Sequence, residues 1–375
     1  MRRLAVLVGL PVAAIVLFAL AERRAFTTVA GAGVAGESTS FTHEELRDFS
    51  YLNPIDTHTH IYKDDPAYTS MLQKLHLHIL DIVDVSDNGD PERKSLDKEE
   101  RDVFAVARDS HDRAAVCTSF DPFRINDPNF GSAAIARLNE SFSRGAIAVK
   151  LWKNIGMEIK DTHGNYVLPD QPVLEPVYRD IAARHKTLLT HVADPDTAWE
   201  HLGNQPDARY YSEHPEWYLQ TIQGAPTKAD ILLARDHVLE ENSDLRVVGA
   251  HLGSMESNLN QIAQHLDEHP NFAVDLAGRI PYLTALPREV AVAFITKYQD
   301  RILYGTDDTI YPQDDVNRAV AQMDWSYAED WRYFATGKTL TYHHRTVEGL
   351  GLSKSVLRRI YHDNAVHWFP GILKN

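Results

Sequence analysis

Cysteine is nearly absent from the sequence. Cys117 is the single cysteine among 375 residues, and it lies in the apolar run RAAVCTSF. One thiol cannot form a disulfide within the chain, and a cysteine-based zinc site is excluded as well. We interpret Cys117 as a buried structural thiol.

Basic charge is also scarce. The chain has 38 Lys and Arg residues against 53 Asp and Glu residues, a formal net charge of -15. The acidic residues are spread along the sequence, whereas binding to nucleic acid needs clustered Lys and Arg. We therefore expect no nucleic-acid partner. With 43% hydrophobic residues, the composition is that of a globular protein with a sizeable core.

Other organising features are missing too. No G-x-G-x-x-G motif follows an early apolar run, so nothing indicates a dinucleotide site. The sequence has no internal repeat, low-complexity tract or sign of a second domain. We expect one domain over residues 42–375.

The N-terminus carries the longest hydrophobic run. Arg2 and Arg3 precede LAVLVGLPVAAIVLFALA (residues 4–21), which ends in an A-x-A pattern typical of signal-peptidase cleavage. Residues 1–21 are predicted to be a signal peptide or, if uncleaved, a membrane anchor, because about 18 apolar residues lie at the border between the two. Residues 22–41 are predicted to be a flexible tether. The protein is expected to be exported, or anchored to a membrane through residues 4–21.

From residue 51 onward, short apolar runs alternate with segments of helical periodicity. The runs are rich in β-branched residues, as expected of strands covered on both faces. The predicted strands are residues 51–60, 76–86, 113–122, 146–154, 187–194, 246–253, 272–279 and 301–309. The clearest predicted helices are residues 98–109, 132–144, 175–185, 229–241 and 255–269. This alternation predicts an α/β fold of the (β/α)8 TIM-barrel type, with a doubly wound open sheet as the alternative.

Two connections are unusually long. Residues 195–228 are rich in aromatic side chains and are predicted to be a lid or pocket wall, or else a surface excursion that packs on itself. Residues 310–375 are predicted to hold the eighth helix and extra C-terminal helices.

Histidine is abundant, with 19 in the chain. The motif D-T-H-T-H at residues 56–60 is a weak signal alone, because roughly one H-x-H pair is expected by chance. His76 and His78 form another such pair, but they begin a predicted strand. Chemistry in a (β/α)8 barrel gathers where the strands end, so position must decide between the two pairs.

Polar residues at the predicted strand ends are a more selective signal. They are Asp56, His58 and His60 on the first strand, Lys150 and Trp152 on the fourth, His191 on the fifth, His251 on the sixth and Asp307 on the eighth. The two-residue period of a strand places the first three on one face. A chance scatter of histidines would not produce this set, so we predict a site at these strand ends.

These segments resemble the amidohydrolase superfamily. Within it they are most similar to the amidohydrolase-related group that contains aminocarboxymuconate-semialdehyde decarboxylase. The resemblance runs from about residue 52 to residue 370. It is carried by IDTHTH, AIAVKLW, TLLTHVADP, VGAHLGS, RILYGTDDT and HDNAVHWF. It implies a metal-dependent enzyme that acts on a small-molecule substrate.

The resemblance also implies a ligand set. The residues that would bind a divalent metal are His58, His60, His191 and Asp307. Zn²⁺ is the expected ion, one or two per chain, with Mn²⁺ and Fe²⁺ as alternatives. Asp307 would also accept a proton from the attacking water, while His251 would orient that water or polarise the substrate carbonyl. Asp56 and Asp308 are candidate partners of the ligands.

Lys150 has two interpretations. In superfamily members with two metal ions, a lysine on the fourth strand is carboxylated and bridges the ions. Otherwise Lys150 is a cation that binds substrate or pairs with Asp121. Two metal ions per chain would favour the first interpretation and one ion the second.

Two arginines follow predicted strands at the same end of the barrel. Arg124 lies in DPFR after the third strand, and Arg279 lies in LAGR after the seventh. They are predicted to clamp a substrate carboxylate, with surface salt bridges as the alternative. Trp152, Trp199 and Trp217 suggest a ring-bearing or flat substrate.

Three functions follow from this reading. The leading hypothesis is a metal-dependent hydrolase, in which activated water attacks an ester, lactone or amide carbonyl. The alternative is a non-oxidative decarboxylase that uses the same metal site. The predicted export segment favours hydrolysis, because the decarboxylases of this group act inside cells. A third hypothesis is an inactive barrel that serves as a binding module. A homodimer is expected on general grounds.

Overall fold

A computed structural model describes residues 40–85, 96–201, 208–343 and 345–374. The predicted signal peptide or anchor (1–21) and all but the last two residues of the predicted tether (22–41) lie outside the described residues. Among the helices of the described ranges, none is long and apolar enough to cross a membrane.

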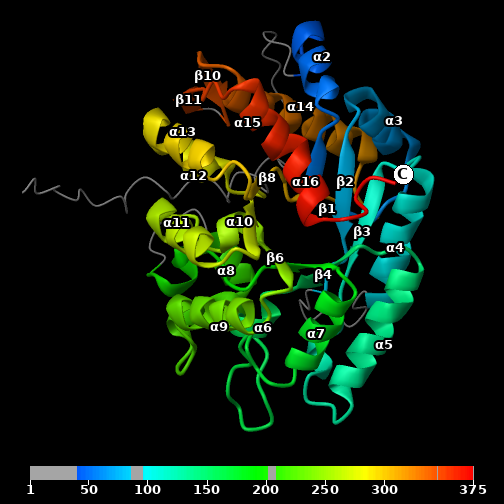
Figure 1. The fold of residues 1–375 in the computed structure, drawn as a ribbon, viewed down its shortest axis with the longest axis vertical. Coiled ribbons are helices and arrows are strands. Elements are labelled where there is room, and N and C mark those ends of the chain that lie inside the picture. The colour runs from blue at the N-terminus through cyan, green and yellow to red at the C-terminus, as the bar shows by residue number, and fades with distance from the viewer. Residues whose placement is uncertain (1–39, 86–95, 202–207, 344, 375) are drawn as a thin grey trace, which may run out of the picture.

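The fold is the predicted (β/α)8 barrel, a ring of parallel strands enclosed by helices (Figure 1). The strands are β1 (Ile55–Ile61), β2 (His78–Ile82), β3 (Ala114–Thr118), β4 (Ala148–Leu151), β5 (Thr187–Thr190), β6 (Arg246–Gly249), β7 (Phe272–Asp275), β8 (Ile302–Leu303) and β9 (Asp308–Ile310). Their order in the sheet is β8-β7-β6-β5-β4-β3-β2-β1-β9. From β1 to β8, neighbours in the chain are therefore neighbours in the sheet, as successive βαβ units require.

The predicted eighth strand is divided into β8 and β9. β8 pairs with β7, and β9 pairs with β1. Between them, the carbonyl of Tyr304 accepts a hydrogen bond from the amide of Thr57 at 3.0 Å, and the amide of Asp307 donates to the carbonyl of His58 at 2.8 Å. The divided strand thus closes the ring and brings Asp307 beside His58.

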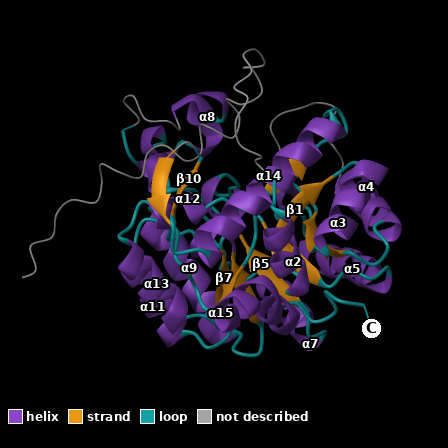
Figure 2. Cartoon of the chain, turned by 90° about the horizontal axis from the view of Figure 1, so that it is seen from above, coloured by secondary structure: helices purple, strands orange, loops and turns teal. Residues whose placement is uncertain are grey.

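Helices cover the outside of the ring (Figures 1 and 2). The longer ones are α2 (His43–Tyr51), α3 (Pro66–Leu75), α4 (Leu96–Asp109), α5 (Phe130–Ser143), α7 (Glu175–Ala183), α9 (Lys228–Glu241), α11 (Leu259–Glu268), α13 (Arg288–Lys297) and α14 (Val316–Ala335). The five predicted helices are all present. α11 begins later than predicted, because residues 254–257 form turns and Asn258 caps the helix.

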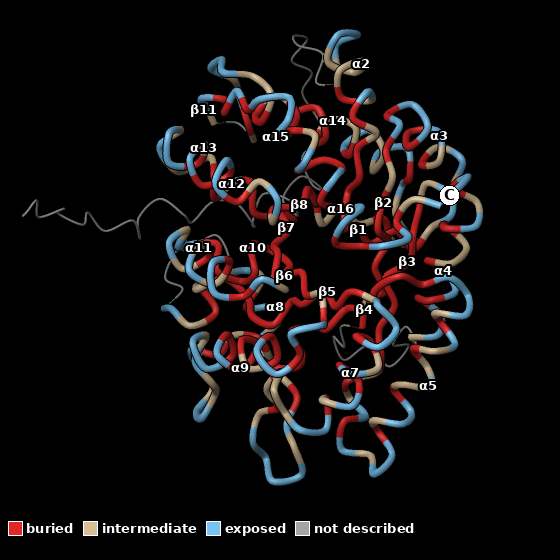
Figure 3. The backbone as a smooth tube through the Cα atoms, in the orientation of Figure 1, coloured by how far each residue is buried: buried red, intermediate tan, exposed pale blue. Residues whose placement is uncertain are grey.

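The sheet separates two apolar layers, and its strands lie in the buried interior of the protein (Figure 3). In β2, for example, Ile79 packs outward toward the helices while Leu80 packs inside the ring. Trp368 and Phe369, near the C-terminus, join the inner layer. Cys117 is fully buried there, and burial raises the pKa of its thiol to about 12. The interpretation of Cys117 as a structural thiol is confirmed.

The C-terminal region contains the expected helices and one hairpin that was not predicted. After α14 come β10 (Thr339–Tyr342), β11 (Arg345–Glu348), α15 (Lys354–Arg358) and α16 (Asn364–Trp368). The two strands are antiparallel. The hydroxyl of Tyr342 donates to Asp330 of α14 at 2.7 Å and fixes the hairpin to that helix. The alternating pattern TLTY was the available signal for a strand.

Gly249 ends β6 at a point of close packing. A Cβ atom added there would lie 2.6 Å from Cζ of Phe272 and 2.7 Å from Cα of Gly253. We expect Gly249→Ala to lower the free energy of unfolding by about 1–3 kcal/mol, because the strand and the aromatic ring of Phe272 must move apart to make room for the added methyl group. Urea unfolding followed by circular dichroism measures this.

Gly131→Ala in α5 is the matched control. Its added Cβ would meet only the carbonyl of Val173, at 3.8 Å. We expect the free energy of unfolding to stay unchanged or to rise by up to about 1 kcal/mol. Equal losses in the two variants would show that packing at Gly249 is not the cause.

Candidate metal centre and active site

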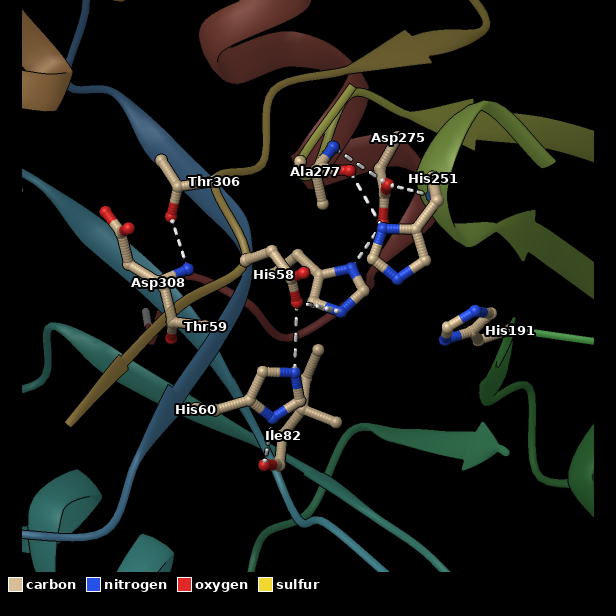
Figure 4. Close-up of polar contacts among 12 residues, drawn as sticks. His58, Thr59, His60, Ile82, His191, His251, Asp275, Ala277, Thr306 and Asp308 are labelled. Atoms are coloured by element: carbon tan, nitrogen blue, oxygen red, sulfur yellow. Dashed lines mark hydrogen bonds and ion pairs between the residues drawn. The ribbon is translucent and has the colours of Figure 1, made fainter. Parts of the chain in front are cut away.

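Polar residues gather at the C-terminal ends of the strands. His58 and His60 lie in β1, His191 follows β5, His251 follows β6 and Asp307 precedes β9. Figure 4 shows the four imidazole rings around a common space. His78, by contrast, begins β2 and pairs with Ile55 at the start of β1, so the second H-x-H motif lies at the other end of the barrel, as predicted.

The carboxylate of Asp56 fixes the backbone of β1. It accepts hydrogen bonds from the amides of His58 (3.0 Å) and Thr306 (3.1 Å), and from the hydroxyls of Thr306 (2.7 Å) and Tyr327 (2.8 Å). Burial nevertheless raises the pKa of Asp56 to about 7. Asp56 thus joins β1 to the closing strand through the backbone amides of His58 and Thr306. The imidazole of His58 binds a different carboxylate.

Three side chains lie close enough together to hold one ion. Nε2 of His58 and Nε2 of His60 are each 3.5 Å from Oδ1 of Asp307. In a tetrahedral zinc site with bonds of about 2.0–2.1 Å, ligand atoms lie roughly 3.3 Å apart. These three residues form a group whose ligand atoms all lie within 4.8 Å of one another. Both the donor types and their spacing fit a divalent metal ion.

The protein holds the second nitrogen of each of these rings. Nδ1 of His58 lies 2.8 Å from Oδ2 of Asp275, and Nδ1 of His60 lies 3.1 Å from the carbonyl of Ile82. An Nδ1–H that donates to these oxygens leaves Nε2 unprotonated and facing Asp307. Burial lowers the pKa of His58, which also favours the neutral ring that can bind a metal.

Asp275 was missed by the sequence analysis, although it supports two of the histidines, one through its ring and the other through its backbone amide. Its Oδ2 holds His58, while its Oδ1 accepts hydrogen bonds from the amides of His251 (2.7 Å) and Ala277 (3.1 Å). Asp275 is the last residue of β7 and is fully buried. The signal in the sequence was its position, because Asp275 is the polar residue at the C-terminal end of the apolar run FAVD.

Asp307 has an unusual backbone conformation. Its φ angle is 69°, in the left-handed region, and its amide donates to the carbonyl of His58. The carboxylate remains 32% exposed, while the imidazole of His58 is almost fully buried. Burial acts to raise the pKa of Asp307, but His251, His60 and His58 together hold it well below its usual value. The carboxylate is therefore ionised at neutral pH.

His251 begins a left-handed turn directly after β6. Its φ angle is 58°, and Leu252 has a φ angle of 57°. Nδ1 of His251 lies 2.8 Å from the carbonyl of Ala277. Burial holds the pKa of His251 well below its usual value, so the neutral ring donates from Nδ1 and presents Nε2 as a hydrogen-bond acceptor. A neutral His251 suits the predicted role of orienting water, but it cannot donate to a substrate carbonyl.

His191 reaches the site but not the three-residue group. Its ring centroid lies 4.4 Å from that of His251, yet His191 is outside the group formed by His58, His60 and Asp307. Nε2 of His191 is buried, makes no hydrogen bond within the described ranges and lies 3.4 Å from Oδ1 of Asp194. Coordination through His191 therefore requires its ring to turn. Burial lowers the pKa of His191 to about 4, so a neutral imidazole is available.

Lys150 lies beside the candidate ligands. It is fully buried, and its Nζ is 3.1 Å from Nε2 of His58. Burial lowers the pKa of this amine. The expected pairing with Asp121 is wrong, because Asp121 instead caps the short helix that begins at Pro122.

A cavity of about 240 Å³ opens onto these side chains. Its lining includes Trp152, Lys153, Asn154, Tyr210, His214, Trp217, Thr309 and Tyr311. Tyr210 and His214 come from α8 (Ala208–Glu213) and the residue after it, and Trp217 comes from the next helical turn. Part of the long 195–228 connection is thus a pocket wall. Trp199 has another role, because its Nε1 donates to the carbonyl of Pro226.

The two arginines differ in their surroundings. Arg124 is 70% exposed, pairs with Asp127 at 2.6 Å and borders a different hollow. Its predicted part in a clamp is wrong, and the surface salt bridge is the correct interpretation. Arg279 is only 4% exposed. Among the described residues no carboxylate lies within salt-bridge distance of Arg279, which donates one hydrogen bond to the carbonyl of Gly278 at 3.1 Å and has no acceptor for its buried Nε.

A second group of possible ligands lies between α9 and α11. It consists of Asp236, His265 and His269. Arg235, which is almost fully buried, already donates two hydrogen bonds to Asp236 and lies 3.2 Å from Nδ1 of His265. A guanidinium in this position repels a metal cation, so we interpret the group as a structural ion-pair network.

Comparison with known proteins agrees with the fold. A family model described as amidohydrolase matches residues 55–371. No protein of curated function matches the sequence. The matched length covers the barrel from β1 to the segment after α16, including every candidate ligand.

Several solved structures share the fold. The 2,6-dihydroxybenzoate decarboxylase from Rhizobium is 14% identical, with a TM-score of 0.50 over 84% of this chain and 98% of that chain. A putative 2-pyrone-4,6-dicarboxylic acid hydrolase from Pseudomonas putida is 14% identical, with a TM-score of 0.50 over 86% and 99%. An uncharacterised TIM-barrel protein from Bordetella bronchiseptica is 17% identical, with a TM-score of 0.46 over 85% and 99%. Identities this low concern the fold alone. Because the family model covers most of its length, the chain belongs to the amidohydrolase family.

Proposed function

We propose that the protein is a metal-dependent hydrolase in which water attacks an ester, lactone or amide carbonyl of a small, carboxylated substrate. The observation that carries the proposal is the convergence of Nε2 of His58, Nε2 of His60 and Oδ1 of Asp307 at the cavity. Zinc is the proposed ion because two imidazoles and a carboxylate are ligands that it favours.

His58, His60 and Asp307 would hold the ion, joined by His191 once its ring turns away from Asp194. A divalent ion there would act as a Lewis acid and lower the pKa of water toward neutrality. The second carboxylate oxygen of Asp307 accepts the proton of the attacking water and passes it to the leaving group. His251 orients the water through Nε2, since its Nδ1 is occupied by the carbonyl of Ala277.

Arg279 is proposed to bind the substrate carboxylate. Burial acts against its charge, but Tyr282, Glu256 and Asp307 together hold the pKa of Arg279 above its usual value. A buried guanidinium without a carboxylate partner destabilises the free protein and gains from an incoming anion. Trp152, whose Nε1 donates to the carbonyl of Val83 at 3.1 Å, offers a flat wall of the cavity to such a substrate.

We expect Arg279→Met to raise KM for carboxylated substrates by about 10–100-fold, because a charge-assisted hydrogen bond contributes about 1.5–3 kcal/mol. The melting temperature of the free variant should stay the same or rise, since a buried unpaired charge has been removed. Arg124→Met is the control and should leave KM within twofold. An unchanged KM in Arg279→Met for every carboxylated substrate would exclude the clamp.

The second candidate is a non-oxidative decarboxylase. It is supported by the fold shared with the Rhizobium decarboxylase at a TM-score of 0.50 and by the buried Arg279, which has no carboxylate within salt-bridge distance among the described residues and suits a carboxylic acid substrate equally well. Reaction in H₂¹⁸O distinguishes the two functions. Incorporation of ¹⁸O into an acid product supports the hydrolase, whereas release of CO₂ without incorporation supports the decarboxylase.

Metal analysis of the purified protein tests the common premise. One ion per chain would support the site of His58, His60 and Asp307 with Lys150 as a cation. Two ions per chain would support a carboxylated Lys150 as a bridge, because burial favours the neutral amine that reacts with CO₂. A protein that binds no divalent metal, even after metal is supplied, would refute the proposal.

A further inference from the structure

Lys153 follows β4, and its ammonium group is buried beside the cavity. Only 5% of the residue is exposed. Its Nζ donates hydrogen bonds to Oδ1 of Asp194 at 2.7 Å, to Oδ2 of Asp194 at 2.8 Å and to the hydroxyl of Tyr210 at 2.7 Å. The ring of Trp217 lies over the same atom, 3.6 Å from Nζ to the centroid. All three N–H donors of Lys153 are therefore in use.

These partners come from separate parts of the chain. Tyr210 and Trp217 belong to residues 208–217, which we call the aromatic wall. Its rings stack, with centroids 6.0 Å apart for Tyr210 and Trp217 and 4.9 Å apart for His214 and Trp217. Asp194, by contrast, follows β5 and lies close to His191. One ammonium group thus connects the wall of the cavity to a strand end that carries a candidate ligand.

The contact between Lys153 and Asp194 also explains the state of His191. Oδ1 of Asp194 lies only 3.4 Å from Nε2 of His191, yet this nitrogen makes no hydrogen bond among the described residues. Lys153 donates to both oxygens of Asp194, so two of the lone pairs that could accept from the imidazole are taken by the ammonium group. Nε2 of His191 consequently has no hydrogen-bond partner among the described residues, and the ring can turn toward the cavity.

We propose that Lys153 is a positioning residue with two effects. It fixes the aromatic wall over the cavity, and it restrains Asp194 so that His191 remains free to bind a metal ion. The second effect rests on the proposed function, whereas the first does not. Lys153 itself has no donor left for substrate, which separates its role from that of Arg279.

Tyr210→Phe tests the wall, because it removes only the hydroxyl that Lys153 binds. We expect KM to rise about tenfold, the loss of one hydrogen bond to a charged group, with kcat within twofold. In the metal-free protein, acrylamide should quench the fluorescence of Trp217 more strongly, measured as the difference from the same protein carrying Trp217→Phe. Tyr211→Phe is the control, because it removes a hydroxyl of the same wall that Lys153 does not bind, while its ring contacts both Tyr210 and Tyr218. Unchanged KM and unchanged quenching in Tyr210→Phe would refute the first effect.

The double variant Lys153→Met/Asp194→Asn tests the restraint on His191. Lys153→Met alone leaves a buried carboxylate unpaired and can fail to fold, whereas the double variant removes both charges. Its residue 194 is free to bind the His191 ring. We expect zinc affinity, measured by chelator competition on the metal-free protein, to fall about 10–100-fold, as on loss of other residues that orient a ligand.

Lys160→Met is the control for the double variant. Lys160 is exposed and lies over the ring of Tyr166 at 4.6 Å, so its replacement removes a cation on an aromatic ring away from the cavity. Its zinc affinity should match that of the unmodified protein. A folded double variant with zinc affinity within twofold of the unmodified protein would refute the second effect. If the unmodified protein bound no zinc, both the proposed function and the effect on His191 would be refuted. The quenching of Trp217 would still test the effect on the aromatic wall.

Discussion

We expect Asp307→Asn to lower kcat/KM by about 10²- to 10⁴-fold while the chain stays folded, because the amide cannot take the proton of the attacking water. Asparagine has nearly the same shape as aspartate and tolerates the left-handed φ angle of 69° that residue 307 adopts. The fold should therefore be preserved. Steady-state kinetics with metal in excess, together with thermal unfolding, measure the two quantities.

Asp315→Asn is the control for this substitution. Asp315 caps α14 by accepting a hydrogen bond from the amide of Arg318, and asparagine caps a helix equally well. Neither activity nor melting temperature should change by a measurable amount. If Asp307→Asn bound metal and kept more than a tenth of the activity, Asp307 would not be the proton acceptor.

The second large effect is expected for Asp275→Asn. The carboxylate accepts the Nδ1–H of His58, whereas an asparagine Nδ2 in its place would donate to Nδ1. The ring of His58 would then carry its proton on Nε2, the nitrogen that must bind the metal. We expect metal affinity to fall at least about 10–100-fold. Chelator competition on the metal-free protein gives the affinity, and kcat/KM should fall in parallel when metal is limiting.

The chain offers a close match as control for Asp275. On the surface, Oδ2 of Asp170 lies 2.8 Å from Nδ1 of His237, the same contact at the same distance as between Asp275 and His58. Asp170→Asn should leave metal affinity and activity unchanged. The interpretation of Asp275 fails if Asp275→Asn remains folded and binds zinc as tightly as Asp170→Asn does.

Much of the architecture could be predicted because the strands and helices of the barrel depend on short-range patterns of apolar and polar residues. Near-continuous apolar runs separated by helical periodicity predicted eight barrel strands and five of the outer helices, since both faces of each strand are covered. The hairpin of β10 and β11 was missed because its two short strands give only a weak alternating pattern and helices were expected in that region. The division of the eighth strand was also missed, because hydrogen bonds from β1 and β7, and not local propensity, decide where pairing stops.

The site was predicted in part for a similar reason. Strand ends indicated His58, His60, His191, His251 and Asp307 as members of one cavity. Arg124 and Arg279 both follow predicted strands, so the same role in a substrate clamp was predicted for both. The exposure of the first and the burial of the second depend on which elements cover them. Asp275 and Lys153 were overlooked because their importance lies in contacts with residues far away in the chain.

The sequence by itself determined the barrel, its polar rim and the types of ligand available, because strand and helix periods and the end of each strand are local properties. Only the tertiary structure decided which imidazole nitrogens bind protein oxygens and that Asp275 binds the ring of His58 whereas Lys153 holds Asp194 beside His191. It also decided that no carboxylate of the described residues lies within salt-bridge distance of Arg279. The reason is physical. Hydrogen-bond partners and burial depend on contacts between side chains that are far apart in the sequence, and no local pattern specifies those contacts.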